Sequence, residues 1–215
     1  MGHVTGCVIH ILTTRKNKRN HFSLDPAALR HQNSMTKMYD VSLTVSEQLP
    51  VWPDDPTIKM TLSHRLEKGD PCNVMALQFS THTGTHIDAP FHFLSTGASI
   101  EQLPLDVLIG PCRVLEFSHV PQSIDHESLR KLNLEGVKRI LFKTRNSEQW
   151  QQELQVFDPN YVYLTTEGAT YLNEIGIQLI GIDGLSIEKF NHPGHPTHHV
   201  LLKNRVIILE GLNLS

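Results

Sequence analysis

The stretch STHTGTHIDAPFH, residues 80–92, brings three histidines and one aspartate together. Imidazole nitrogens and carboxylate oxygens suit zinc, manganese or iron, and no thiolate lies among them. His82 and His86 are four residues apart, which would place both on one face of a helix. Gly84 weakens a helix, however, and Pro90 blocks its continuation. We therefore expect a loop at the carboxyl end of a strand to present a metal site here.

Asp88 and His92 extend this cluster in two different ways. Asp88 has two carboxylate oxygens and can therefore bridge a pair of cations. His92 lies beyond Pro90 and need not bind metal, because neutral imidazole titrates near working pH and can transfer protons. The alternative is a set of ordinary packed or surface histidines, in a chain that has 14 of them. Four metal-compatible groups after one strand end favour the metal site.

A second group of chemically capable residues lies near the carboxyl terminus. The stretch NHPGHPTHHV, residues 191–200, is rich in histidine, and we expect His192 and His195 in a solvated loop. Glu210 lies in the apolar run VIILEGL, where an unpaired carboxylate would be costly to bury. It therefore needs a cation, a metal or a hydrogen-bond donor, unless it is half-exposed at a strand end. These residues by themselves leave both interpretations open.

The elements that must position these residues change character along the chain. Apolar and polar residues alternate at 39–45, 57–64 and 73–83, as in half-buried strands. Further elements are predicted in the second half: strands at 112–117, 137–144, 177–183 and 205–212, and helices at 125–133, 165–176 and 197–204. Asp125 is the expected amino-terminal cap of the first of these helices, and Gly176 closes the second. A strand-rich half followed by strand–helix alternation predicts one mixed α/β domain.

The distribution of charge limits the classes of partner. Residues 1–37 hold six basic residues and one acidic residue, whereas the remainder holds 13 basic and 21 acidic residues. Because the chain after residue 37 is this acidic, we do not expect nucleic acid to be the main partner. The three cysteines are widely spaced and do not make a disulfide framework, and no apolar run reaches the roughly 18–20 residues that span a bilayer. We expect a cytoplasmic protein that acts on a small molecule and does not engage a membrane.

The basic amino-terminal segment sets itself apart from the rest of the chain. Residues 1–37 show no sustained periodicity, and we expect them to form a flexible basic extension of a folded domain at 38–215. Organelle targeting by this segment is the alternative to a cytoplasmic location.

The motif around the first cluster resembles that of a known family. The run HTGTHIDAPFH is similar to the H-x-G-T-H-x-D-x-P-x-H motif of the cyclase-like metal-dependent hydrolases, which include bacterial kynurenine formamidases (arylformamidases) and isatin hydrolases. The similarity continues through YDVSLTVSEQLPVWPDDP, LIGIDGLSIEKF and HHVLLKNRVIILEGLNL. It therefore covers the chain from about Tyr39 to the end, and residues 1–37 fall outside it.

The resemblance implies a role for six of these residues. In the family, positions that match His82, His86 and Asp88 bind one metal ion. The aspartate also reaches a second ion, which is completed by positions that match His198 and Glu210. His199 does not fit that spacing. The last motif histidine, which matches His92, is the family's acid/base group.

The resemblance also implies a pocket, a fold and an activity. Trp52 matches an aromatic residue that lines the family's substrate pocket, although Asp54 stands where many relatives have glycine. The implied fold is a single swivelling β/β/α domain, with a mixed or barrel-like β core flanked by helices. Relatives commonly assemble as homo-oligomers, either dimers or tetramers.

The implied reaction is hydrolysis of a carbon–nitrogen bond outside peptides. N-formyl-L-kynurenine is the expected substrate, giving L-kynurenine and formate in tryptophan degradation. Another ring-opening amidase of the family, such as an isatin hydrolase, is the first alternative, and a non-catalytic metal- or ligand-binding protein is the second. One or two divalent ions per subunit are expected, with zinc favoured and manganese the alternative. The complete set of site residues favours an enzyme.

Overall fold

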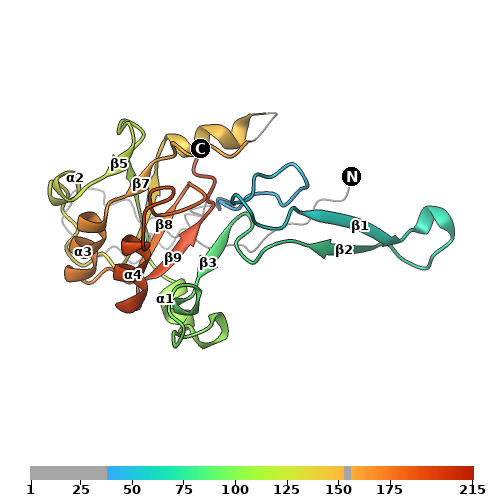
Figure 1. The fold of residues 1–215 in the computed structure, drawn as a ribbon, viewed down its shortest axis with the longest axis horizontal. Coiled ribbons are helices and arrows are strands. Elements are labelled where there is room, and N and C mark those ends of the chain that lie inside the picture. The colour runs from blue at the N-terminus through green and yellow to red at the C-terminus, as the bar shows by residue number, and fades with distance from the viewer. Residues whose placement is uncertain (1–37, 153–155) are drawn as a thin grey trace, which may run out of the picture.

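The computed structural model describes residues 38–152 and 156–215, and its centre is a mixed five-stranded β-sheet (Figure 1). In spatial order its strands are β3 (His86–Asp88), β9 (Ile207–Glu210), β8 (Leu179–Ile182), β6 (Arg139–Lys143) and β4 (Arg113–Glu116). The neighbours from β9 to β4 run parallel, whereas β3 pairs with β9 antiparallel. All of β8 and β9 is buried, as apolar runs in a parallel sheet require.

Both faces of this sheet are covered. Three helices lie together on one side of it in Figure 1: α2 (His126–Arg130), α3 (Thr166–Glu174) and α4 (Pro196–Lys203). Their buried residues share one apolar cluster with alternate residues of the strands, among them Leu129, Leu172, Leu201, Ile140, Ile180 and Ile208. The intervening strand residues pack in a second cluster that includes Leu141, Leu209, Val41, Leu212 and Leu214. Because successive side chains of a strand point to opposite faces of the sheet, β6, β8 and β9 each contribute residues to both apolar clusters.

The predicted helices of the second half are confirmed. The N–H of Ser128 donates to the carboxylate of Asp125 at 2.8 Å, so the predicted cap of α2 is present. Gly176 follows α3 with a φ of 79°, a left-handed conformation that glycine adopts without steric cost. The predicted strands of this half correspond to β4, β6, β8 and β9, and the mixed α/β fold with flanking helices is confirmed.

The predicted strand at 39–45 is wrong. The segment has no strand ladder beyond a bridge at Val45. Its backbone bonds instead to isolated partners: the carbonyl of Val41 accepts from the N–H of Asn213 at 2.9 Å, and the N–H of Leu43 donates to Thr85 Oγ1 at 2.8 Å. Val41 and Leu43 are buried, so the alternation reflects burial of one side rather than pairing.

The predicted strand at 73–83 is shorter than expected. It ends as β2 (Val74–Gln78), which pairs antiparallel with β1 (Lys59–His64) in a hairpin that projects away from the sheet in Figure 1. The remaining elements are short: η1 (Leu66–Lys68), η2 (Pro90–His92), η3 (Ile100–Gln102), α1 (Leu105–Leu108), β5 (Ser123–Ile124), η4 (Arg145–Gln151) and β7 (Tyr163–Leu164). Strands β5 and β7 pair parallel with each other.

Two further predictions concern the amino-terminal extension and membrane-spanning helices. The basic extension at 1–37 lies outside the described residues, so the boundary before residue 38 stays a prediction. Within 38–152 and 156–215, no helix is both long and apolar enough to cross a bilayer.

Candidate metal centre

The pairing of β3 with β9 creates the centre of the site. His86 and Asp88 are two residues apart on β3 and therefore project to the same face of the sheet. His86 is the register partner of Glu210 at the end of β9. Its Nε2 atom is 3.4 Å from Asp88 Oδ1 and 3.5 Å from Glu210 Oε2. Both carboxylates are buried, so these polar groups face one another away from bulk water.

His198 approaches the same two carboxylates from the first turn of α4. Its Nε2 atom is 3.7 Å from Asp88 Oδ2 and 3.5 Å from Glu210 Oε1, and the residue is buried. The fold therefore brings together His86, Asp88, His198 and Glu210, which come from β3, α4 and β9.

His82 and His92 flank this centre on its open side. His82 lies in the turn before β3, and its Nδ1 atom is 3.0 Å from Asp88 Oδ1. His92 ends the η2 turn after β3, and its ring stacks on that of His82 with centroids 3.8 Å apart. The expected loop support is thus correct for His82 only, because His86 and Asp88 lie on a strand. Pairing with β9 supplies the backbone hydrogen bonds that a loop would lack.

One backbone contact fixes the direction of the His86 ring. Its Nδ1 atom is 3.0 Å from the carbonyl oxygen of Gly84, which can only accept a hydrogen bond. In the neutral ring the proton therefore lies on Nδ1, and the Nε2 lone pair faces Asp88 and Glu210. Gly84 has a φ of 66°, which turns its carbonyl toward this ring.

Burial and the neighbouring charges shift the pKa values of this cluster in opposite directions. Burial by itself would lower the pKa of His86, but Asp88 and Glu210 outweigh it and raise that pKa to about 10. The pKa of His198 rises to about 9 in spite of burial, because Glu188 and Glu210 face its ring. Burial opposes ionisation of Asp88 and Glu210, yet the neighbouring histidines keep the pKa of each carboxylate below its usual range. Positive charge is therefore stabilised at the centre.

Several buried atoms in this centre lack a hydrogen-bond partner. His86 Nε2 and both oxygens of Asp88 are buried and make no hydrogen bond of acceptable geometry among the described residues, although their ion-pair distances are short. Such atoms are costly unless a cation or a donor satisfies them. Nitrogen and oxygen donors of this kind fit a divalent metal ion. Two groups of three possible ligands share Asp88: one has His82 and His92, the other His86 and Glu210.

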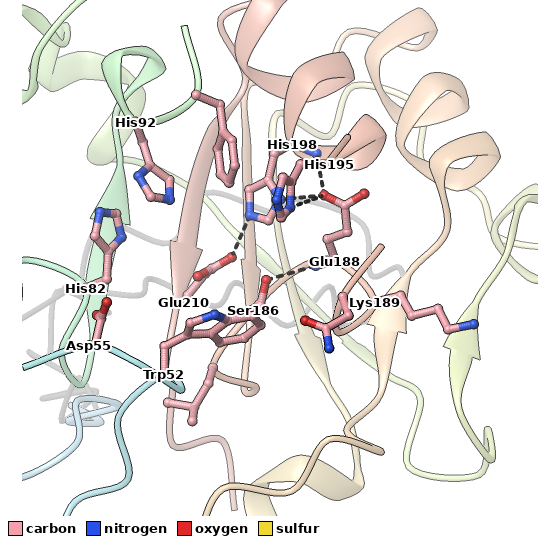
Figure 2. A pocket seen from close by; sticks show the side chains of 13 residues that line it. Trp52, Asp55, His82, His92, Ser186, Glu188, Lys189, His195, His198 and Glu210 are labelled. Carbon is pink, nitrogen blue, oxygen red and sulfur yellow. Dashed lines mark hydrogen bonds and ion pairs between the residues drawn. The ribbon is translucent and has the colours of Figure 1, made fainter. Parts of the chain in front are cut away.

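A pocket of about 260 Å³ opens onto this centre (Figure 2). His82, His92, His198 and Glu210 line one part of it, and Trp52 lies across from them. Burial lowers the pKa of His92 below its usual range, so its ring is neutral at pH 7. The pocket thus combines a polar, metal-compatible floor with an aromatic wall.

Trp52 is held by other aromatic rings. Its ring centroid is 5.3 Å from that of Phe190 and 5.4 Å from that of Phe157, both in edge-on arrangements. On the opposite side, Phe93 packs against His198 with centroids 4.5 Å apart. These contacts fix the walls on either side of the polar floor.

Some functional residues were not anticipated from the sequence. Glu188 is buried, and its Oε2 atom is 2.6 Å from His198 Nδ1. His192 and His195 lie in the loop before α4, as expected, and His195 is exposed. His195 also lines the pocket, however, and His192 is half-buried and contacts Glu188. Glu210 was singled out as a carboxylate within an apolar run, whereas Glu188 lies in the mixed stretch LSIEKF, where no such signal exists. Further lining residues are Asp55, Leu185, Ser186, Lys189 and Asn191.

Comparison with known proteins places these residues in a family. The family model "Cyclase" matches residues 39–189. The chain belongs to the cyclase family. It is 39% identical to a kynurenine formamidase from Geobacillus thermodenitrificans over 182 residues, and this aligned region covers 84% of each chain. The cyclase-like resemblance drawn from the motif is thereby confirmed.

Solved structures agree with this assignment. A structure described as a "Potential Metal-Dependent Hydrolase With Cyclase Activity" is 36% identical, with a TM-score of 0.70 over 82% of each chain. Isatin hydrolase A from Labrenzia aggregata is 21% identical, with a TM-score of 0.65 over 80% of this chain and 79% of that chain. At that identity the second similarity concerns the fold alone. The cyclase-family chain described here is therefore a hydrolase of this fold that uses a divalent metal.

Proposed function

We propose that this protein hydrolyses N-formyl-L-kynurenine to L-kynurenine and formate. The observation that carries the proposal is the convergence of His82, His86, Asp88, His198 and Glu210 on one point beneath an aromatic-walled pocket. The relatives named kynurenine formamidase, with 39% identity over most of the chain, support it. An aryl formamide suits such a pocket, because its ring can lie against Trp52 while its formyl group faces the polar floor.

The ligand set divides around Asp88. His82, His86 and Asp88 would hold one ion, and Asp88, His198 and Glu210 would hold a second. We favour zinc at both positions, with manganese the alternative, because nitrogen and oxygen donors accept either. Divalent ions in such sites supply Lewis-acid chemistry, which activates water and polarises a carbonyl oxygen.

His92 would move the protons of the reaction. Its neutral ring can take a proton from the attacking water and return it to the aryl amine nitrogen as the formyl carbon–nitrogen bond breaks. The products are then formate and a free aryl amine. Stacking on His82 keeps the ring at the pocket edge, beside the centre. Trp52 would orient the aryl part of the substrate.

A homo-oligomer, either a dimer or a tetramer, is part of the proposal. The projecting hairpin exposes Val74 and Leu77 on β2, and Phe79 follows directly. Apolar side chains gathered on a projecting element are typical of a subunit contact. Light scattering after size-exclusion chromatography measures the assembly. The cytoplasmic location stays a prediction from the sequence, with cell fractionation as its test.

The decisive experiment pairs metal analysis with two assays. Purified protein is analysed for zinc, manganese and iron, and then assayed in parallel on N-formyl-L-kynurenine and on isatin. We expect bound divalent metal, turnover of the formamide, and loss of turnover on chelation that the same metal restores. Turnover of isatin alone would replace the proposal with the ring-opening alternative. Stoichiometric metal with no turnover of either compound would favour a binding protein.

A further inference from the structure

Glu188 is a buried carboxylate whose two oxygens are both occupied by one short segment of chain. Its Oε2 atom is 2.6 Å from the Nδ1 atom of His198 and accepts from the N–H of the same residue at 3.3 Å. Its Oε1 atom accepts from the N–H of Thr197 at 2.9 Å and is 3.0 Å from the Nδ1 atom of His192. The residue is 1% exposed, so water does not compete for these contacts.

These backbone contacts anchor the start of α4. The first N–H groups of a helix have no partner within the helix, and a carboxylate there is also favoured by the helix dipole. His195, which precedes α4, makes no side-chain capping bond and has a left-handed φ of 46°. Glu188 supplies the missing acceptors from a different segment of the chain. The first turn of α4 is thereby held beside the metal centre.

The side-chain contact determines which nitrogen of His198 can bind a cation. Each oxygen of Glu188 accepts from a backbone N–H group, Oε1 from Thr197 and Oε2 from His198, which is the pattern of an ionised carboxylate. An ionised carboxylate can only accept, so the proton of the neutral ring lies on Nδ1. The lone pair is left on Nε2, which faces Glu210 (Figure 2) and is also 3.7 Å from Asp88 Oδ2.

The segment around Glu188 also holds the opposite ligand. The N–H of Ile187 donates to Glu210 Oε1 at 2.7 Å, which leaves Oε2 of that carboxylate facing His86. The segment itself is fixed, because the hydroxyl of Tyr161 donates to the carbonyl of Glu188 at 2.7 Å. Two neighbouring residues therefore orient His198 and Glu210 from the same side.

We propose that Glu188 is a positioning residue of the metal centre, which holds His198 with Nε2 toward Asp88 and Glu210 and thereby sets the affinity for metal. The inference rests on the ligand role of His198 in the proposed function, but not on the identity of the substrate. A hydrogen-bond partner of a ligating histidine typically contributes about 10–100-fold to metal affinity.

The test compares metal binding by the metal-free forms of two variants, the first of which keeps the shape of the side chain. Glu188→Gln removes one acceptor and the charge, and we expect zinc and manganese affinity, measured by titration against a chelator, to fall about 10–100-fold. His192→Gln alters another contact to the same carboxylate without touching a proposed ligand, and we expect parental affinity. Parental affinity in Glu188→Gln, or an equal loss in both variants, would overturn the proposal.

A double variant separates positioning of His198 from general loss of structure. If Glu188 acts through His198, then Glu188→Gln has no further effect on metal affinity once His198→Ala is present. Additive losses would contradict the proposal, and so would a His198→Ala variant with parental affinity. A protein that binds metal in this pattern but leaves N-formyl-L-kynurenine intact would overturn the proposed function and leave Glu188 in its role.

One measurement needs no variant and therefore remains decisive if Glu188→Gln fails to fold. Nitrogen-15 spectra of the metal-loaded parental protein report which imidazole nitrogen carries a proton. We expect His198 to carry its proton on Nδ1 and to bind metal through Nε2. Metal on Nδ1 of His198 would show that Glu188 does not set the ring orientation.

Discussion

His86 lies directly opposite Glu210 in the antiparallel pairing of β3 with β9, and its Nε2 atom is 3.5 Å from Glu210 Oε2. Backbone pairing therefore sets the distance between two groups that are remote in sequence. A slip of one residue in this register would turn one of the two side chains to the other face of the sheet. The site depends on this register as much as on the residues themselves.

Glu210→Gln tests the carboxylate of this pair while keeping its shape. The amide oxygen can still accept from the N–H of Ile187, so we expect the fold to persist. A neutral amide is a poor ligand for a divalent ion, and we expect zinc affinity to fall by at least the roughly 10–100-fold that loss of a ligand's hydrogen-bond partner produces. Calorimetric titration of the metal-free variant measures the change. Glu174→Gln, an exposed position at the end of α3, is the control and should bind as the parent does.

His92→Gln separates proton transfer from metal binding. We expect parental metal content and a decrease in kcat of about 10²–10⁴-fold, the usual contribution of a positioned acid or base. Because burial lowers the pKa of His92, its neutral form persists to below pH 6.5, and the acidic limb of the parental rate profile should lie there. That limb should disappear in the variant. His64→Gln, exposed on β1, should leave the profile unchanged.

Loss of metal from His92→Gln would contradict this assignment. His82, Asp88 and His92 also form a possible ligand group, so the metal content of the variant decides between the two roles. Metal content and turnover should therefore be measured on the same preparation.

Metal binding should release protons. The pKa of His86 is raised to about 10 and that of His198 to about 9, so both rings are protonated in the metal-free protein at pH 7. A metal ion needs their lone pairs, so we expect about two protons to leave per protein when both positions fill. Titration calorimetry at pH 7 in buffers of different ionisation enthalpy counts these protons. A heat independent of the buffer would contradict the prediction.

The same pKa shifts determine how metal-free stability varies with pH. A pKa raised on folding stabilises the protein fully below the ordinary histidine value of about 6.5, and that contribution is lost as the pH rises through 9 to 10. We therefore expect the melting temperature of the metal-free protein to fall between pH 8 and 10. Metal affinity should increase over the same range, up to about pH 10, because fewer protons must be displaced from His198 and His86.

Much of the fold could be predicted from the sequence because local patterns determine it. The apolar runs that became β8 and β9 are buried on both faces, and Asp125 caps α2 as its position before the helix indicates. The alternation at 39–45 was misleading, since it records burial of Val41 and Leu43 and says nothing of a pairing partner. A pattern of buried residues thus predicts where a strand or helix lies better than it predicts which strands pair with each other.

From residue types alone, the site was predictable only as far as its residues were clustered in the sequence, and the family resemblance added the distant His198 and Glu210. His82, His86 and Asp88 lie within one motif, and residue types alone indicated a metal. The pairing of β3 with β9 and the contact between Glu188 and His198 depend on long-range packing, which no local pattern records. Glu188 lies in the mixed stretch LSIEKF, so its burial could not be read from its sequence neighbours.

Gly211→Ala tests the close approach that joins the two halves of the site. Gly211 has a φ of 66°, and an added Cβ would lie 2.1 Å from the carbonyl oxygen of Gly84. Thr85 bridges the same point, since its hydroxyl donates to the carbonyl of Gly211 at 2.5 Å. The left-handed backbone alone should cost an alanine about 1–3 kcal/mol, and the clash adds to that cost. Relief of the clash must separate β3 from the end of β9, so we expect weaker metal binding as well.

Gly136→Ala is the matched control for this variant. Gly136 has a similar φ of 73°, but nothing lies within 4 Å of the added Cβ, so only the backbone cost applies. Denaturant unfolding of both metal-free variants measures the free energy of unfolding, and zinc titration of the folded forms measures the site. We expect Gly136→Ala to bind zinc as the parent does and to lose less stability than Gly211→Ala. Equal losses of stability in the two variants, with equal zinc affinity, would mean that the contact between Gly84 and Gly211 does not maintain the spacing of His86 and Glu210.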